Sequence, residues 1–456
     1  MSEFLFNEFE TISAKQWKQK IQVDLKGANY NDTLVWNSTE GINVKPFYHR
    51  DDFQATFSAV PGHPKKWSIA QEFFVDDESI VNGLILEAIK NGTEAIVLAS
   101  EKEFDPSKIF KNFSFESVTI YFKLQFLSEN FFFQLKQFLS EKKAAVFYNI
   151  DIIGNLARSG NWFHNLNQDH AILEKIISEN RFENILSVDT GFYQNAGANM
   201  VQQLAYGLAH AAEYLNHFTA DGAKNPKMTF QIANGSNYFF EIAKIRALRK
   251  LYALLASEFN VSETCHVIAR PSKRNKTIYD YNVNMLRTTT ECMSAVLGGA
   301  DTIGNISYDY LYHKSNKFGE RISRNQLLIL KAESYFETVS NPADGAYYIE
   351  QLTDELAEKS LALFKDIERN GGFLSQLKEG TIQRKIKESA NKEQELFDDA
   401  KLVLLGTNKH PNASDRMKDD LELFPFIKTK VRKTLISPII ERRLAEKMEQ
   451  IRLNNE

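Results

Sequence analysis

The sequence predicts an α/β protein built on a TIM-type (β/α)8 barrel, and three observations lead to this fold class. Short β-rich runs alternate with amphipathic helical patterns from residue 61 to residue 345. There are eight such runs, the number that a closed barrel of parallel strands requires. The competing fold is a doubly wound open sheet, which usually has a glycine-rich phosphate turn after its first strand. Here the first predicted strand is followed by Phe74-Val-Asp-Asp-Glu-Ser79, which is not such a turn.

The eight predicted strands are short and rich in β-branched and aromatic residues. They are Trp67–Phe73, Ala95–Ala99, Val118–Phe122, Ala144–Asn149, Ile185–Asp189, Met228–Ala233, Cys265–Ala269 and Asp301–Ile306. Between them lie helical patterns at Glu78–Asn91, Asn130–Lys142, Asn199–Phe218 and Tyr238–Glu258. We therefore expect helices to connect consecutive strands and to cover the outside of the barrel.

Two further helices end the predicted barrel. The first stops at Gly298-Gly299, because glycine tolerates the left-handed conformation that ends a helix. The second runs from about Arg321 to Ser334, and Pro342 and Gly345 mark the turn that follows it. The positions expected to face inward are Leu286, Met293 and Leu297 on the first helix and Ile322, Leu327, Leu330 and Ala332 on the second.

Residues 1–60 form a predicted N-terminal arm that is separate from the barrel. A short helix through Trp17 and Ile21 is expected to end near Gly27, and the extended segments 33–36 and 44–48 flank a turn. So small a unit cannot bury its large apolar side chains within itself. We expect the arm to pack against the barrel or against another subunit.

Residues 346–456 form a predicted C-terminal helical extension. Thr353 is the expected N-cap of its first helix, which ends at Asn370-Gly371-Gly372. Further helices are expected around residues 377–388 and 393–400, a short strand at 403–405 and a last polar helix at 441–452.

Composition and charge exclude several classes of function. The net charge of −4 and the lack of a domain-sized basic region argue against a nucleic-acid partner. No apolar stretch approaches the roughly 18 residues of a membrane span, and the acidic N-terminus lacks the basic region of a signal peptide. Two cysteines, Cys265 and Cys292, form neither a disulfide framework nor a metal pattern. These features predict a cytoplasmic protein with no membrane contact.

The histidines do not predict a metal site. His164 and His170 are expected in polar loops or at the surface. His210 and His217 share one helix face, but no third ligand follows at a recognised spacing. The aromatic run 131–133 is expected to be core rather than a stacking surface.

Four polar residues lie near the carboxyl ends of predicted strands, where barrel enzymes form their sites. They are Asp151, Arg158, Asp189 and Tyr193. We interpret them as a packed polar cluster rather than a binding site. We therefore expect no catalytic, cofactor-binding or metal-binding residue in this chain.

Several long motifs occur in one order along nearly the whole chain. They are Arg287-Thr288-Thr289 through Gly298-Gly299, Arg321-Ile-Ser-Arg-Asn325 with Glu333, Asn341-Pro-Ala-Asp-Gly345-Ala-Tyr347, and Trp17, Asp24-Leu-Lys-Gly27, Trp36 and Glu40-Gly41 in the arm. In these motifs the chain resembles the acyl-CoA mutase family, and methylmalonyl-CoA mutase in particular.

The resemblance implies a subunit of an isomerase, an intramolecular transferase that interconverts methylmalonyl-CoA and succinyl-CoA. In that family adenosylcobalamin supplies a radical, and the barrel lumen shields the migrating acyl-CoA thioester group. Catalytic members carry a cobalamin domain marked by Asp-x-His-x-x-Gly. This motif does not occur in the 456 residues, and His410 is followed by Pro-Asn-Ala. We expect this chain to bind no cofactor and to contain no cobalamin-binding domain.

The chain departs from the catalytic pattern at the positions that would face a substrate. The catalytic run W-T-I-R-Q-Y becomes Trp67-Ser-Ile-Ala-Gln-Glu72, which loses the arginine and the tyrosine. The G-Y-H run becomes Gly191-Phe-Tyr193, and L-H-T-N-S becomes Ile303-Gly-Asn-Ile-Ser307, so both histidines are lost. Neither Glu nor Gly can donate the hydrogen bond that a phenol or imidazole donates.

These departures resemble the branch of small, non-catalytic subunits in heterodimeric methylmalonyl-CoA mutases. The implied partner is a catalytic large subunit that carries adenosylcobalamin. One alternative is a barrel-only catalytic subunit whose cobalamin domain is a separate chain, and such an enzyme should keep the missing side chains. Another is a stand-alone acyl-CoA-binding protein.

Overall fold

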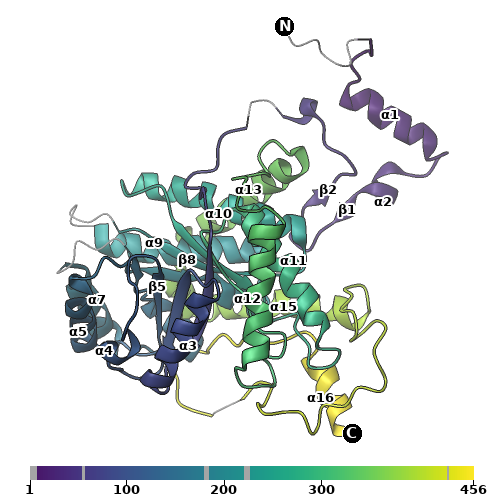
Figure 1. Cartoon of the computed structure of the whole chain (residues 1–456). Helices are drawn as coiled ribbons and strands as arrows, with labels where there is room; N and C mark the ends of the chain where they lie inside the picture. Colours follow the sequence, from purple (N-terminus) through teal and green to yellow (C-terminus); the bar gives the residue numbers. More distant parts are fainter. Residues whose placement is uncertain (1–7, 54–56, 179–183, 220–225, 429–430) are drawn as a thin grey trace.

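A computed structural model describes residues 8–53, 57–178, 184–219, 226–428 and 431–456, and its layout is shown in Figure 1. Eight parallel strands form its central sheet, which confirms the TIM-type α/β fold. They are β3 (Ser68–Phe74), β4 (Ala95–Ser100), β5 (Thr119–Leu124), β6 (Val146–Phe147), β7 (Ser187–Asp189), β8 (Thr229–Asn234), β9 (His266–Pro271) and β10 (Thr302–Gly304). Each falls within or beside its predicted run.

The strands are ordered β6-β5-β4-β3-β10-β9-β8-β7, and every neighbouring pair is parallel. The two ends of this order meet beyond β6. Ile150 forms a parallel bridge with Leu186, and the Ser187 N–H donates to the Ile150 carbonyl at 3.1 Å. This contact brings the end strands together and curls the sheet into a barrel.

Helices cover the outside of the sheet (Figure 1). They are α3 (Glu78–Lys90), α4 (Pro106–Ile109), α5 (Glu129–Ser140), α6 (Ile152–Ser159), α7 (Leu166–Ser178), α8 (Thr190–Asn195), α9 (Met200–Thr219), α10 (Tyr238–Glu258), α11 (Val283–Gly298) and α12 (Lys317–Leu328). The four predicted patterns at α3, α5, α9 and α10 are confirmed. Phe131 and Phe132 of α5 are buried in the core, as expected, whereas Phe133 is only half-buried.

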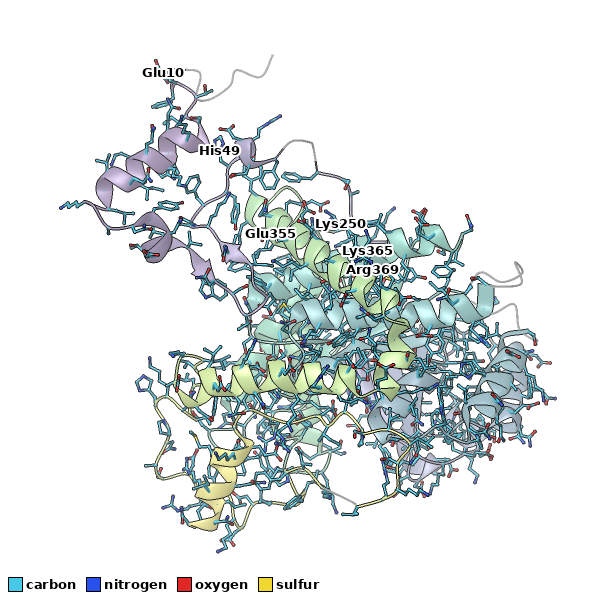
Figure 2. All side chains as sticks on the ribbon, turned by 180° about the vertical axis from the view of Figure 1, so that it is seen from behind. Glu10, His49, Lys250, Glu355, Lys365 and Arg369 are labelled. Carbon is cyan, nitrogen blue, oxygen red and sulfur yellow. The ribbon has the colours of Figure 1, made fainter. Side chains whose placement is uncertain are left out.

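A third layer covers α9 and α10. Helix α13 (Tyr347–Arg369) packs across both, so these two helices are buried on both sides. The buried Arg246 of α10 meets Glu350 of α13 at 2.6 Å. Lys365 and Arg369 lie on the exposed outer side of α13 (Figure 2).

Two predicted inward faces are partly wrong. Leu286 is 67% exposed, because the inner face of α11 is polar at this end and pairs Glu291 with Lys276 at 2.7 Å. On the following helix Leu327 and Leu330 are buried, but Ala332 is exposed. A π-helical turn at Ile329–Glu333 widens the helix there and rotates the later residues away from the core.

The first helix of the arm stands apart from the barrel in Figure 1, whereas Ile42 and Val44 further along are buried in the main core. The arm contains α1 (Ala14–Asp24), α2 (Tyr30–Leu34) and an antiparallel pair of β1 (Trp36–Asn37) with β2 (Asn43–Val44). Residues 33–34 are therefore helical rather than extended, because the Asn29 side chain caps α2. Helix α1 buries no residue of its own, whereas Trp36 contacts Phe240 of α10 edge-to-face at 5.7 Å.

The C-terminal extension differs from its prediction in three places. Thr353 lies inside α13, which begins at Tyr347, and its hydroxyl donates to the Ile349 carbonyl at 2.7 Å instead of capping the helix. The two helices expected at 377–388 and 393–400 are largely one, α15 (Thr381–Asp398), preceded by α14 (Gly372–Lys378). Residues 403–405 form only a single bridge, Leu405 to Lys409, and the last helix is α16 (Glu446–Asn454).

Candidate functional site

The lower part of the barrel lumen is filled by stacked rings. Tyr121 stacks on Phe147 with ring centroids 4.7 Å apart and on His266 at 5.7 Å. Its hydroxyl lies 2.7 Å from the Thr302 hydroxyl and 2.9 Å from His266 Nε2. Burial raises the pKa of Tyr121 and lowers that of His266, so both groups are neutral at pH 7. Buried aliphatic residues complete this layer at Ala70, Ala95, Val97 and Ile268.

A charged layer lies above the rings, at the carboxyl ends of the strands. Glu72 of β3 accepts hydrogen bonds from Arg270 of β9 and, at 3.4 Å, from Lys123 of β5. The three side chains are 35%, 23% and 41% exposed respectively, so solvent enters the mouth of the barrel as far as this layer. Desolvation nonetheless lowers the pKa of Lys123.

A second ion pair flanks this layer. Arg158 Nη2 lies 2.9 Å from Asp189 Oδ2, and the guanidinium also lies over the Phe192 ring at 4.6 Å. Asp189 Oδ1 accepts from the Phe192 N–H at 3.1 Å. Burial raises the pKa of Asp189 even though Arg158 opposes that change.

Asp151 is the centre of a more deeply buried group. Its Oδ1 lies 2.9 Å from His210 Nε2 and accepts from the Tyr214 hydroxyl at 2.8 Å and the Gly154 N–H at 2.8 Å. Burial raises the pKa of Asp151, but His210 and these hydrogen bonds outweigh it and set the pKa below its ordinary value. The Tyr193 hydroxyl lies 3.0 Å from His210 Nδ1. Tyr193 therefore lies between α8 and α9 instead of facing the lumen.

The four polar residues singled out in the sequence thus divide into two groups. Arg158 and Asp189 meet at the mouth of the barrel, while Asp151 and Tyr193 are linked through His210 beneath it. All four make polar contacts with other protein groups.

The C-terminal tail crosses the mouth of the barrel. The N–H groups of Ile439, Arg442 and Leu444 donate to the backbone carbonyls of Ala157 in α6, Asn195 in α8 and Arg274 in the loop after β9, at 2.9, 3.0 and 2.9 Å. Glu441 accepts from the Asn195 side chain at 3.0 Å. Its negative charge opposes the lowering of the pKa of Lys123 and adds to the raising of the pKa of Asp189. We call residues 434–445 the tail strap.

Sequence reasoning singled out Glu72 but missed its partners Lys123 and Arg270. Both lie at inward-facing positions near strand ends, which is the one feature that could have indicated them. It also missed the tail strap, because nothing in residues 434–445 indicates which loops they contact.

No group of three or more potential metal ligands occurs among the described residues. His217 lies 2.7 Å from Glu174, and His164 Nδ1 lies 3.0 Å from Asp169. Cys265 and Cys292 are both buried and free, and burial raises the pKa of the Cys265 thiol to about 12. In the described part of the chain, no helix is both long and apolar enough to cross a membrane.

Comparison with known proteins identifies related chains. The family model described as methylmalonyl-CoA mutase matches residues 111–452. A methylmalonyl-CoA mutase small subunit from Porphyromonas gingivalis is 31% identical, over 92% of this chain and 73% of that protein. A protein of the same name from Streptomyces virginiae is 27% identical, over 83% of this chain and 67% of its own length. Among solved structures, Xanthomonas albilineans dihydropteroate synthase covers 59% of this chain and 92% of its own, with 10% identity and a TM-score of 0.29.

Proposed function

Because this chain belongs to the methylmalonyl-CoA mutase family, a family of isomerases, we propose that it is the small, non-catalytic subunit of a heterodimeric mutase. In this role it stabilises a catalytic large subunit that interconverts methylmalonyl-CoA and succinyl-CoA. The large subunit carries adenosylcobalamin, whose carbon–cobalt bond supplies the radical.

One observation carries the proposal: the polar groups of the lumen are paired with each other. Polarising a thioester carbonyl requires a hydrogen-bond donor aimed at the position where the oxygen will lie. At the place of the expected phenol stands Glu72, which as a carboxylate only accepts and is held by Arg270 and Lys123. The smaller Ala70 beside it is 4% exposed and packs within the ring layer. The donors of the lumen are therefore engaged with protein groups: Arg270 and Lys123 contact Glu72, and the Tyr121 hydroxyl contacts Thr302 and His266.

The residues at the mouth do not fit the cofactor. The cobalt-binding motif does not occur in the 456 residues. The tail strap also contacts α6, α8 and the loop after β9, three segments that follow strands at the carboxyl end of the sheet, where a barrel presents its reactive face. For this reason we place adenosylcobalamin on the partner and assign no reaction step to this chain.

The arm offers the contact surface for that partner. Ile12, Trp17 and Val23 are 57%, 48% and 73% exposed, and α1 buries no residue within its own chain. A helix with exposed aromatic and aliphatic side chains is typical of a protein interface rather than of a solvated surface. We propose residues 1–60 as the main subunit contact.

Co-expression with a candidate large subunit tests the proposal. We expect a one-to-one complex on size exclusion and mutase activity that disappears when the large subunit's site is disabled. Turnover by this chain with a free cobalamin domain and no large subunit would instead support a barrel-only enzyme. The charged layer at the mouth is accessible to water, and this observation is the reason to measure turnover without the large subunit as well.

A further inference from the structure

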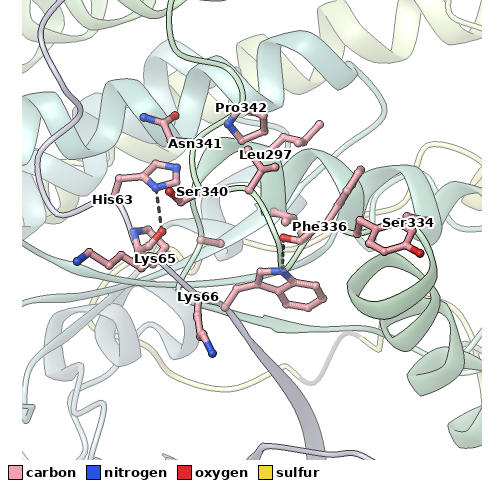
Figure 3. A pocket seen from close by; sticks show the side chains of 15 residues that line it. His63, Lys65, Lys66, Leu297, Ser334, Phe336, Ser340, Asn341 and Pro342 are labelled. Atoms are coloured by element: carbon pink, nitrogen blue, oxygen red, sulfur yellow. Dashed lines mark hydrogen bonds between the residues drawn. The ribbon is translucent and has the colours of Figure 1, made fainter.

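A pocket lies at the end of the barrel opposite the charged layer. Its lining comes from residues 63–67 before β3, residues 296–300 at the end of α11, and the loop 334–342 that leads to α13. The cavity volume is about 280 Å³, close to the lower end of ordinary small-molecule sites, about 300–1,000 Å³. We call it the amino-end pocket (Figure 3).

The walls of the amino-end pocket are largely apolar. Trp67 is 5% exposed and is fixed in place, since its indole N–H donates to the Phe336 carbonyl at 3.2 Å and Lys331 Nζ lies 5.1 Å from its ring. Apolar groups from α11 and the loop complete the walls, at Val296, Leu297, Ala300, Val339 and Pro342. A rigid aromatic floor with aliphatic walls suits an apolar ligand body.

The polar groups of the pocket carry positive charge. Of the 15 residues that line it, two are lysines, Lys65 and Lys66, and none is Asp or Glu. Neither lysine forms an ion pair with any residue that the structure describes. The nearby Asp301 and Asp344 are already paired, with Arg249 at 2.6 Å and Arg246 at 2.7 Å. The lining itself therefore carries two positive charges, while Glu337 of the same loop is exposed and lies outside the lining.

Further donors stand on the loop side. Asn341 receives a hydrogen bond from Arg246 on its Oδ1 at 2.9 Å, which leaves the Nδ2 amide of the same side chain as a donor. Ser334 and Ser340 add hydroxyl groups to the lining. Figure 3 shows Asn341, Ser340 and His63 close together on one side of the pocket, away from Ser334.

The loop is also held in a conformation that its residues rarely adopt. Tyr335 has φ of 58° and Asn341 has φ of 54°, both left-handed, and Tyr335 is 70% exposed. The π-helical turn at Ile329–Glu333 comes directly before them. Such backbone features concentrate at ligand sites, where surrounding contacts hold the unfavourable conformation.

We propose that the amino-end pocket binds a small carboxylic acid with an apolar body, such as a medium-chain fatty acid. The body lies against Trp67 and the aliphatic wall, and the carboxylate meets the lysines and the loop donors at the rim. This site is separate from the barrel mouth. It lies where the arm joins the barrel and where the loop leads into α13, so a bound acid contacts both connections.

Titration of the full chain with sodium octanoate by isothermal calorimetry tests the proposal. We expect one saturable site with a dissociation constant of about 0.1 mM, a reasonable value for a ligand of this size. Octylammonium has the same apolar body with the opposite charge, and we expect it to bind at least about tenfold more weakly because of the two lysines. Equal binding of the two probes, or no saturable octanoate binding, would overturn the proposal.

Matched variants locate the binding. Val339→Glu adds a negative charge at an exposed position of the pocket wall, and Val403→Glu makes the same change at an exposed valine outside the pocket lining. We expect Val339→Glu to weaken octanoate binding about tenfold or more and Val403→Glu to leave it unchanged, with both variants keeping the wild-type circular dichroism and Tm. Replacing Lys65 and Lys66 together by Ala should reduce the difference in binding affinity between octanoate and octylammonium. If Val339→Glu binds as the wild type does, the site lies elsewhere and the proposal is wrong.

Discussion

The barrel lumen and the N-terminal arm differ in how their side chains are satisfied: the lumen pairs its polar groups, whereas the arm leaves apolar groups exposed. In the lumen, polar side chains that could act on a substrate contact each other, as in the pairs Glu72–Arg270 and Arg158–Asp189. In the arm, apolar side chains that could be buried remain in solvent, as Trp17 and Val23 show. Since exposed apolar surface favours association and paired polar groups favour a closed interior, the difference indicates a chain adapted to a protein partner.

The largest expected effect on the lumen side comes from Asp151→Ala. This change removes the acceptor of His210, Tyr214 and Gly154, so we expect a loss of about 3–5 kcal/mol in the free energy of unfolding at pH 7. Chemical denaturation measures it. Asp77→Ala is the control, because Asp77 only caps the exposed start of α3 and should cost about 1 kcal/mol.

The same variant should change the pH dependence of stability. The pKa of Asp151 in the folded protein lies below its ordinary value of 3.8, so its ionised form stabilises the fold fully above about pH 4. That stabilisation is lost as the pH falls through the lower, folded pKa. The difference between wild type and Asp151→Ala should therefore shrink below about pH 4, and a difference that grows on acidification would contradict the assigned pairing.

The largest expected effect on the arm side comes from the double variant Trp17→Glu/Val23→Glu. If α1 is the main subunit contact, the complex with the large subunit should weaken by about 2–4 kcal/mol, the cost of losing interface hot spots. The isolated chain should unfold within about 0.5 kcal/mol of wild type, because both side chains are exposed. Leu286→Glu, at a 67% exposed position on the barrel, is the control and should leave the complex intact.

A smaller effect is expected from Tyr121→Phe in the ring layer. It keeps the stacking on Phe147 but removes the hydroxyl that contacts Thr302 and His266. We expect a loss of about 1–2 kcal/mol in unfolding free energy, measured by denaturant titration. No loss would mean that water replaces the hydroxyl, and hence that the lower lumen is wetter than its packing indicates.

The smallest effect is expected from Glu72→Gln. Its ion pairs with Arg270 and Lys123 are partly exposed, and such pairs contribute about 0–1 kcal/mol. The unfolding free energy should change by no more than that. A loss of several kcal/mol would show that the mouth is closed to solvent.

The elements of this fold that could be predicted are those that a local pattern of apolar residues specifies. The eight strands and the helix Tyr238–Glu258 follow from apolar runs of the right length, and these elements are found where expected. Thr353 shows the limit of local rules, since a residue that caps well also fits inside a helix when the chain turns earlier, at Gly345. The prediction that Leu286 faces inward was wrong because the Lys276–Glu291 pair, rather than apolar groups, occupies the inner face of its helix.

The candidate site was less predictable because its contacts join distant segments. Glu72 and Arg270 are 198 positions apart and meet only when the barrel brings β3 and β9 to the same end of the lumen. The tail strap reaches the end of α6 from more than 270 positions away, as the hydrogen bond from the Leu435 N–H to the Gly160 carbonyl illustrates. Motif resemblance identified Glu72 as a departure, but only strand register identifies what it contacts.

The most direct test of a non-catalytic lumen is the mutase rate of the assembled complex carrying Glu72→Gln and Arg270→Gln in this chain. Because these residues contact no reacting group in this account, the purified one-to-one complex should keep kcat and KM within about twofold of wild type. A loss of kcat of about 100-fold or more, in a complex that remains assembled on size exclusion, would show that this lumen takes part in turnover and would contradict the account.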